Sequence, residues 1–144
     1  PTSTIFIVGG IFPLSKALVS SGAAEYLVNA ISPVLSNLPP IILLGAITFL
    51  MLLTTQFLMN SSATVLVLPI AIMLCQAAGI NPLAGAMSVS VCASGAFVTP
   101  FGTAPNLLVW EAGGYSVKDY LKCGFPMLII FCLVTTALCA VFYL

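Results

Sequence analysis

The sequence contains no histidine and very little charge. Among 144 residues there are three basic and three acidic side chains, whereas hydrophobic residues make up 61%. A soluble domain carries about 25% charged residues, so the composition excludes that class. The missing histidine removes the commonest general base and metal ligand of proteins. The absence of any basic cluster argues against nucleic acid as a partner.

The sequence also lacks any paired-cysteine motif. No C-x-x-C occurs, and the five cysteines stand apart from one another as Cys75, Cys92, Cys123, Cys132 and Cys139. Isolated cysteines in apolar runs are expected to pack as small hydrophobes, and no disulfide framework is indicated. A serine nucleophile with no histidine to activate it is improbable. We therefore predict that the protein is not an enzyme and needs no cofactor.

Long apolar runs are what the sequence has in excess. The mean hydropathy is +1.25, and several runs can supply spans of about 20 residues. This predicts an all-α polytopic membrane protein, located in a cell inner or plasma membrane. We expect most of a spanning helix over Thr4–Leu18, a short amphipathic surface helix over Ala23–Ile31 and a final span over Phe125–Leu144. Because the chain starts as Pro-Thr-Ser directly in an apolar run, we expect a fragment of a longer protein.

The first polar interruption of the apolar sequence is Met59-Asn60-Ser61-Ser62-Ala63-Thr64. It separates two predicted helices, Ile41–Phe57 and Ala63–Ala78. A turn between two spanning helices lies in water and favours charge, but this turn has none. The pattern predicts a re-entrant hairpin whose tip stops inside the membrane.

The second interruption is Thr99-Pro100-Phe101-Gly102-Thr103-Ala104-Pro105-Asn106. The helix expected before it, Leu83–Val98, is rich in small residues and should be buried in the bundle. We expect that helix to break at Thr99-Pro100. A second short helix should begin near Pro105 or Asn106, because proline suits a first helical turn, and end near Glu111.

The loop after that short helix is the most polar part of the chain. Ser116 is a plausible N-cap. It should start a short amphipathic piece, separate from the last span, that carries Lys118, Asp119 and Lys122.

Two broken helices offer complementary binding groups. The N-terminus of each second half presents free N–H groups and a positive dipole end, which attract anions. The C-terminus of each first half presents carbonyl oxygens, which can ligate a cation. Neutral oxygen donors suit Na⁺ better than a transition metal, and a proton relay would need an acid or histidine. The alternative is structural, since Ser and Thr often bond back to their own helix and proline can simply kink it.

Both interruptions resemble motifs of a known family. The run from Asn60 through Ala63-Thr64 to Leu68-Pro69-Ile70 resembles the Ser-Asn-Thr signature region of the divalent anion/sodium symporter family, with Met59 and Ser61 in place of its Ser and Thr. The segment from Thr99 to Asn106 is similar to that family's Thr-Pro and Pro-Pro-Asn unwound segment. Gly113-Gly114-Tyr115 and Asp119-Tyr120-Leu121 also look like its bacterial permeases.

The resemblance implies a fold and a set of roles. The chain would be the end of a second inverted repeat, with a scaffold helix and interfacial arm in residues 1–38 and part of the transport domain in residues 39–144. In the family, hairpin tip and unwound segment together hold one Na⁺ and contribute to the anion site. The expected sodium ligands are Asn60, Ser61, Thr99, Gly102 and Thr103. The expected substrate-binding residues are Asn60, Ser61, Ser62, Thr103, Pro105 and Asn106.

The function expected from this resemblance is sodium-coupled symport of di- or tricarboxylates or sulfate by alternating access. The partners would be the small anion, Na⁺, membrane lipid, the N-terminal repeat of the same protein and a second copy in a homodimer. Two alternatives remain open. One is a sodium-independent anion exchanger or proton-coupled permease of the arsenite or organic-anion type, and the other is a non-transporting membrane subunit.

Overall fold

The described part of the chain is built from helices only. The computed structural model describes residues 39–144 continuously and, before them, residues 13, 16, 17, 20–23, 25, 26, 29 and 30. Within residues 39–144 there are five helices and no strand: α3 (Pro40–Phe57), α4 (Asn60–Ala77), α5 (Pro82–Cys92), α6 (Ala104–Gly113) and α7 (Val117–Tyr143). The predicted all-α class is therefore confirmed.

The predictions for the first 38 residues stay predictions. The spanning helix over Thr4–Leu18 falls largely outside the described residues, and the surface helix over Ala23–Ile31 falls partly outside them. The same holds for the proposed division between residues 1–38 and 39–144.

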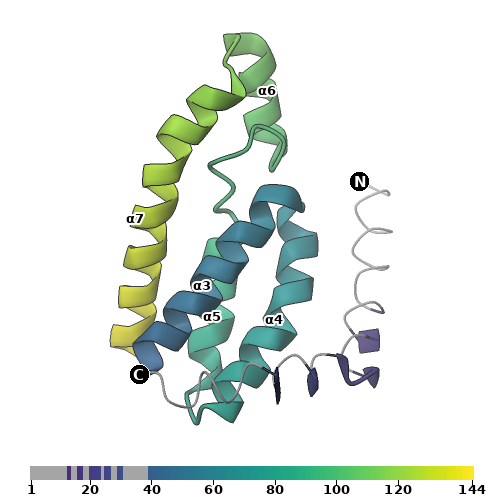
Figure 1. Cartoon of the computed structure of the whole chain (residues 1–144), viewed down its shortest axis with the longest axis vertical. Coiled ribbons are helices and arrows are strands. Elements are labelled where there is room, and N and C mark those ends of the chain that lie inside the picture. Colours follow the sequence, from purple (N-terminus) through teal and green to yellow (C-terminus); the bar gives the residue numbers. More distant parts are fainter. Residues whose placement is uncertain (1–12, 14–15, 18–19, 24, 27–28, 31–38) are drawn as a thin grey trace.

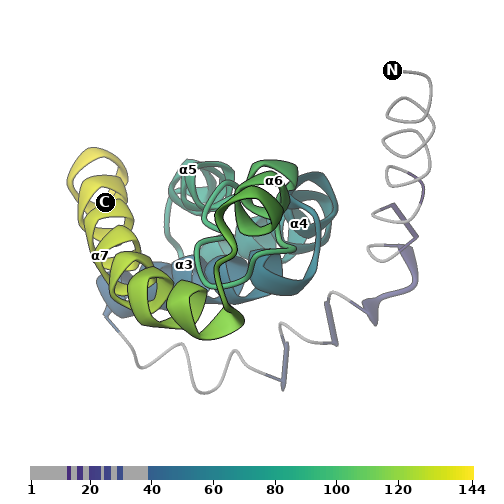
Figure 2. The same cartoon turned by 90° about the horizontal axis from the view of Figure 1, so that it is seen from above.

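The helices run up and down along one long axis (Figure 1). Helix α3 rises, α4 returns beside it, α5 rises again, and α7 descends along the whole length of the molecule. The start of α3, the α4–α5 connection and the C-terminus therefore meet at one end, where Pro39, Asn81 and Leu144 border the same pocket. Seen along the axis, α6 lies above the cluster of α3, α4 and α5, and α7 stands at its side (Figure 2).

Helix α3 is the centre of the core. It packs against α4, α5 and α7, and its Leu44, Met51 and Leu52 have no exposed surface. Helix α5 also lies inside, as predicted from its small residues, with Ala84, Gly85, Ser88, Val89 and Cys92 buried. Small side chains let helix backbones approach closely in an apolar environment, so α5 fits between α3, α4 and α7.

Three helices can cross a bilayer by length and composition. These are α3, α4 and α7, with mean hydropathies of 1.9, 1.5 and 2.5 over their most apolar windows. Many of their large apolar side chains point outward, among them Phe49, Leu53, Ile130 and Leu133. An outward apolar surface of this extent is stable only against lipid or further apolar helices.

The structure corrects two predicted boundaries. Helix α5 ends at Cys92 and not at Val98, so the unwound segment runs over residues 93–103 and is longer than the predicted break at Thr99-Pro100. The reason is tertiary, because carbonyl and amide groups within residues 95–99 bond to α3 in place of their own helix. The amphipathic piece after Ser116 is also not separate, since it continues without interruption into α7.

Ser116 is the N-cap of α7, as predicted. Its hydroxyl accepts a hydrogen bond from the Asp119 backbone N–H at 3.3 Å, and the Asp119 carboxylate accepts from the Ser116 N–H at 2.8 Å. This reciprocal pair is a capping box, which satisfies two N–H groups that the helix leaves free.

Removing the cap should loosen only the first turn of α7. Loss of an N-cap hydroxyl costs about 1 kcal/mol, so Ser116→Ala should speed amide hydrogen exchange of residues 117–122 by about fivefold in the full-length protein. Ser90→Ala is the matched control, because the exposed Ser90 hydroxyl only donates back to Ala86 O. Equal exchange in the variant and the wild type would show that the box does not hold this turn.

Candidate functional site

The hairpin between α3 and α4 turns in only two residues. The N–H of Leu58 closes α3 by donating to Thr54 O at 3.0 Å, and α4 then begins at Asn60 directly after Met59. The carbonyl end of α3 and the amide end of α4 therefore lie next to each other at the tip. Because the tip is so short, a cation-binding end and an anion-binding end are presented together.

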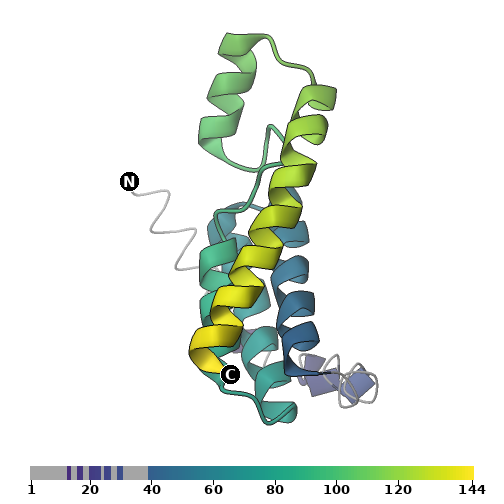
Figure 3. The same cartoon turned by 90° about the vertical axis from the view of Figure 1, so that its left-hand side faces the viewer.

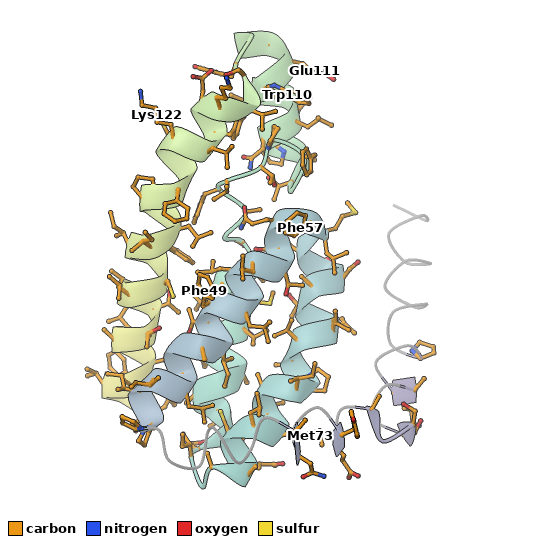
Figure 4. The ribbon with its side chains drawn as sticks, in the orientation of Figure 1. Phe49, Phe57, Met73, Trp110, Glu111 and Lys122 are labelled. Atoms are coloured by element: carbon orange, nitrogen blue, oxygen red, sulfur yellow. The ribbon has the colours of Figure 1, made fainter. Side chains whose placement is uncertain are left out.

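The tip lies beside the unwound segment and not at the far end of the molecule. Figures 1 and 3 both show it level with the coil between α5 and α6, while α6 and the start of α7 continue beyond it. Figure 4 places Phe57 at this turn, and Trp110, Glu111 and Lys122 farther along toward the end of the molecule. The two predicted polar interruptions are thus neighbours in space.

The side chain of Gln56, on the last turn of α3, joins the hairpin to the unwound segment. Its Nε2 donates to Gly95 O at 2.9 Å, and its Oε1 accepts from the Val98 N–H at 2.9 Å. The Thr99 hydroxyl donates to the backbone carbonyl of Gln56 at 2.7 Å. Three hydrogen bonds therefore connect α3 with residues 95–99.

Two glycines let backbone pack on backbone around this segment. A Cβ on Gly124 of α7 would lie 2.7 Å from the carbonyl carbon of Phe97 and 2.9 Å from Val98 Cα. A Cβ on Gly102 would lie 2.9 Å from Thr99 Oγ1 and 3.2 Å from Thr55 O. Real side chains do not tolerate such contacts, so both positions need glycine. The unwound segment is thereby held between α3 on one side and α7 on the other.

Asn106, on the first turn of α6, forms hydrogen bonds to the unwound segment from its C-terminal side. Its Nδ2 donates to Ala96 O at 2.6 Å and to Thr99 O at 3.3 Å. The Tyr120 hydroxyl of α7 donates to the backbone carbonyl of Asn106 at 2.9 Å. The amide nitrogen of Asn106 is therefore used within the segment and stabilises its folded shape.

Asn60 carries a buried acceptor without a partner. Its Oδ1 is the only buried side-chain polar atom among the described residues that makes no hydrogen bond. Such an atom costs about 1–3 kcal/mol when it is left unsatisfied, and in native proteins it often marks the place of an ion or water. It stands at the first residue of α4, directly at the hairpin tip.

The starts of the helices differ in capping. Helices α5 and α7 begin with side-chain caps, from Asn81 and Ser116. Helices α3, α4 and α6, whose N-cap residues are Pro39, Met59 and Thr103, have no side-chain cap bond. The first N–H groups of these helices therefore have no acceptor from the N-cap side chain. Of these three starts, those of α4 and α6 lie at the predicted breaks.

The structure places the predicted site residues in two groups. At the start of α4, Asn60 and Ser62 are partly buried and Ser61 is exposed. The second group lies around the start of α6: Thr99, Gly102, Thr103, Pro105 and Asn106. Gly102 is buried, Thr103 is the N-cap of α6 and Pro105 lies in its first turn. The roles of these residues in binding sodium or substrate stay predictions.

Sequence reasoning missed the residues that hold the site together. Gln56 is 3% exposed, and no role was predicted for it. A long polar side chain on an apolar helix was the available signal, because a buried amide must find partners. The roles of Gly124 and Tyr120 had no signal in the sequence, since they depend on contacts from α7.

Within the described residues, no group of three or more Cys, Asp or Glu side chains lies close enough together to bind a metal ion. What the tip and the break offer is a set of neutral oxygen atoms. Oxygen donors of this kind fit a hard cation and do not fit a soft transition metal.

Comparison with known proteins gives the family. The model of the family described as the sodium:sulfate symporter transmembrane region matches residues 1–144, which is the whole chain. The chain belongs to this family. It is a multi-pass membrane protein, in agreement with the three helices that can cross a bilayer.

Curated relatives of this symporter family cover nearly all of the chain. The chain is 33% identical over 139 residues to an uncharacterized transporter of Synechocystis, covering 96% of the chain and 23% of the relative. It is 33% identical over 130 residues to the rat Na(+)/citrate cotransporter and to rat solute carrier family 13 member 2, covering 90% of the chain in each case. It covers 23% of the cotransporter and 22% of the solute carrier. The chain thus spans about a quarter of the length of these relatives.

Proposed function

We propose that this chain forms part of a secondary active transporter that couples sodium entry to the uptake of a divalent anion. The transported anion would be a di- or tricarboxylate or sulfate. The hairpin tip and the unwound segment would bind Na⁺ and the anion side by side. The observation that carries the proposal is the unpartnered, buried Oδ1 of Asn60 beside the carbonyl end of α3.

The lengths of the helices support a binding site inside the membrane. Helix α5 has 11 residues, which corresponds to a rise of about 16 Å. A bilayer core is about 30 Å thick. If the end with Pro39, Asn81 and Leu144 lies at one membrane surface, the break after α5 lies near the midplane. Unwound backbone at that depth requires cover by protein or a water-filled cavity. Helices α3 and α4 have 18 residues each and rise about 27 Å, so a re-entrant hairpin would have to be tilted to keep its tip inside the bilayer.

The absence of charge supports the choice of ligands. Residues 39–110 contain no Asp, Glu, Lys or Arg, so an anion bound there would have no basic side chain to neutralise it. The uncapped starts of α4 and α6 present N–H groups and positive dipole ends, each equivalent to roughly half a charge. A bound Na⁺ would supply the remaining positive charge. Coupling follows, because the anion is bound strongly only when sodium is present.

The roles of individual residues follow from this arrangement. Sodium would be held by oxygens of Asn60, Ser61, Thr99, Gly102 and Thr103. The anion would be held by Asn60, Ser61, Ser62, Thr103, Pro105 and Asn106. The Thr99 hydroxyl donates its proton to Gln56 O, which leaves the lone pairs of its oxygen free for a cation.

The complete transporter would include an N-terminal repeat and a second copy of the protein. Broken helices in two inverted repeats typically build one site near the midplane, and alternating access moves one bundle against the other. The outward apolar faces of α3, α4 and α7 are compatible with such partners or with lipid.

Uptake of labelled succinate by the full-length protein in liposomes tests the proposal. An inward sodium gradient should drive accumulation at least tenfold above the level with choline, and unlabelled citrate and sulfate should compete to different degrees. Uptake that does not depend on sodium but follows a pH gradient would show proton coupling in place of sodium symport. Uptake that requires an internal anion would show anion exchange. No uptake of any of these anions would contradict the substrate class.

A further inference from the structure

Gln56 uses its whole side-chain amide inside the protein. Its Nε2 donates to Leu52 O at 2.7 Å and to Gly95 O at 2.9 Å, which occupies both N–H groups. Its Oε1 accepts from the Val98 N–H at 2.9 Å. An amide offers two donors and one acceptor oxygen, so the side chain is fully matched to these partners.

The unwound segment depends on these bonds. Residues 93–103 have left the helix, so their carbonyl and N–H groups need partners elsewhere. Gly95 is buried, and its carbonyl accepts from Gln56 and from the Phe97 N–H. Loss of the Gln56 side chain would leave the Gly95 carbonyl with the Phe97 N–H alone and would remove the acceptor of the Val98 N–H. A buried group that loses a partner destabilises its surroundings.

The opposite side of the segment is fixed by α7. Gly124 allows the backbone at Phe97 and Val98 to lie directly on the helix. The segment therefore cannot move away from α3 without also sliding along α7.

We propose that Gln56 is a positioning residue for the ion site: it locks the end of α3 to the unwound segment, so that oxygens at the hairpin tip and at the break keep a fixed spacing. The inference rests on the proposed function, since it assigns Gln56 to the sodium site described there. Asn60 follows Gln56 by four residues, and Thr99 bonds to the Gln56 carbonyl. A shift at Gln56 would therefore move both groups of ligands relative to each other.

The role requires a neutral donor. The carboxylate of Gln56→Glu can accept from the Val98 N–H, but it cannot donate to Leu52 O and Gly95 O. Protonation of that carboxyl restores one donor. Helix α3, the unwound segment and α5 contain no charged residue. The titratable groups on α4, α5 and α7, which pack against α3, are Cys75, Cys92, Lys118, Asp119, Tyr120, Lys122, Cys123, Cys132, Cys139 and Tyr143, and the three charged ones among them are exposed.

The test compares Gln56 with Gln76, the other glutamine, which is exposed in the last turns of α4. Full-length wild type, Gln56→Glu and Gln76→Glu are reconstituted, and sodium-driven uptake is measured at pH 7.5 and 5.5. Rates are expressed as the ratio of variant to wild type at each pH, which removes the effect of substrate protonation. We expect a ratio of about 0.1 for Gln56→Glu at pH 7.5 and a rise of at least fivefold at pH 5.5. Gln76→Glu should stay near 1 at both.

A second substitution separates positioning from folding. Gln56→Met keeps the length of the side chain and removes all its hydrogen bonds. It should raise the sodium concentration for half-maximal uptake at least fivefold at both pH values. Amide hydrogen exchange of residues 95–103 should be at least tenfold faster in Gln56→Met than in wild type and unchanged in Gln76→Met. If the uptake of a single preparation of Gln56→Glu recovers at pH 5.5, the protein in that preparation is folded, and misfolding does not explain its low uptake at pH 7.5.

The outcomes separate this inference from the proposed function. Sodium-independent uptake by the wild type would contradict the proposed function. Amide hydrogen exchange would still show whether Gln56 holds residues 95–103 in place. Two results together would overturn the positioning role. One is an uptake ratio of Gln56→Glu to wild type that is the same at both pH values, and the other is a Gln56→Met variant with wild-type sodium dependence and wild-type amide hydrogen exchange.

Discussion

Replacing Asn60 by alanine should raise the sodium concentration needed for half-maximal uptake by about 10- to 100-fold in the full-length protein. A hydrogen-bonding group that interacts with a charge contributes roughly 1.5–3 kcal/mol, which corresponds to that range. The physical reason is that Oδ1 of Asn60 is buried at the hairpin tip and has no protein partner. Its oxygen is therefore available to a cation.

The same substitution should not weaken the fold when sodium is absent. The side-chain oxygen of Asn60 makes no internal hydrogen bond, and the Thr64 hydroxyl bonds to the backbone carbonyl of Asn60, which alanine keeps. Thermal unfolding in choline should therefore give a midpoint for Asn60→Ala that is no lower than that of the wild type. Addition of sodium should raise the midpoint only in the wild type, because a ligand stabilises the state that binds it.

Asn81→Ala is the matched control, and the opposite result is expected for it. Asn81 lies at the other end of the molecule and caps α5 by accepting from the Leu83 N–H at 3.0 Å. Its loss should cost about 1 kcal/mol of stability and leave the sodium dependence within twofold of wild type. An Asn60→Ala variant with normal sodium dependence would exclude Oδ1 as a sodium ligand.

Replacing Gly124 by alanine should destabilise the protein by roughly 2–3 kcal/mol and reduce uptake at least tenfold. The added Cβ would meet the backbone at Phe97 and Val98, within 2.7 Å of the Phe97 carbonyl carbon. Overpacking of this kind typically costs 1–3 kcal/mol. Backbone atoms cannot turn aside as a side chain can, so α7 or the unwound segment must shift.

Gly45→Ala is the control for a helix-packing glycine. A Cβ on Gly45 of α3 would meet Thr136 of α7 at 3.7 Å, an ordinary van der Waals contact. This variant should keep its unfolding midpoint and its uptake within twofold. The unfolding midpoint and the uptake rate are measured for Gly124→Ala and Gly45→Ala. If Gly124→Ala behaved like Gly45→Ala, the unwound segment would not be held against α7.

Much of this architecture was determined by the sequence alone. The lack of charge and the long apolar runs dictate a membrane protein, because charged side chains are costly in lipid and apolar ones are not. The two polar interruptions predicted where both breaks lie, although the first break is confined to Leu58 and Met59, because Asn60, Ser61 and Ser62 already belong to α4. The hairpin helices Pro40–Phe57 and Asn60–Ala77 agree closely with the predicted ones. The family motifs lie in the same two stretches.

Other features could be decided only by the tertiary structure. The sequence predicted that the helix after Leu83 would reach Val98, because its small residues are compatible with a buried helix. Its actual end at Cys92 is set by Gln56, which lies 42 residues before Val98 in the chain and offers its backbone a better-placed partner. Continuity of α7 and the need for glycine at position 124 likewise depend on contacts between helices.

The two sets of features differ in how far apart along the chain the interacting residues lie. Hydropathy and local motifs report how each residue interacts with solvent, lipid and its near neighbours, so they fix which segments are helical and where a helix is weak. The exact end of a helix depends on which buried N–H and C=O groups find a partner outside it. That partner belongs to a distant segment, and it exists only once α3, α5 and α7 are packed together.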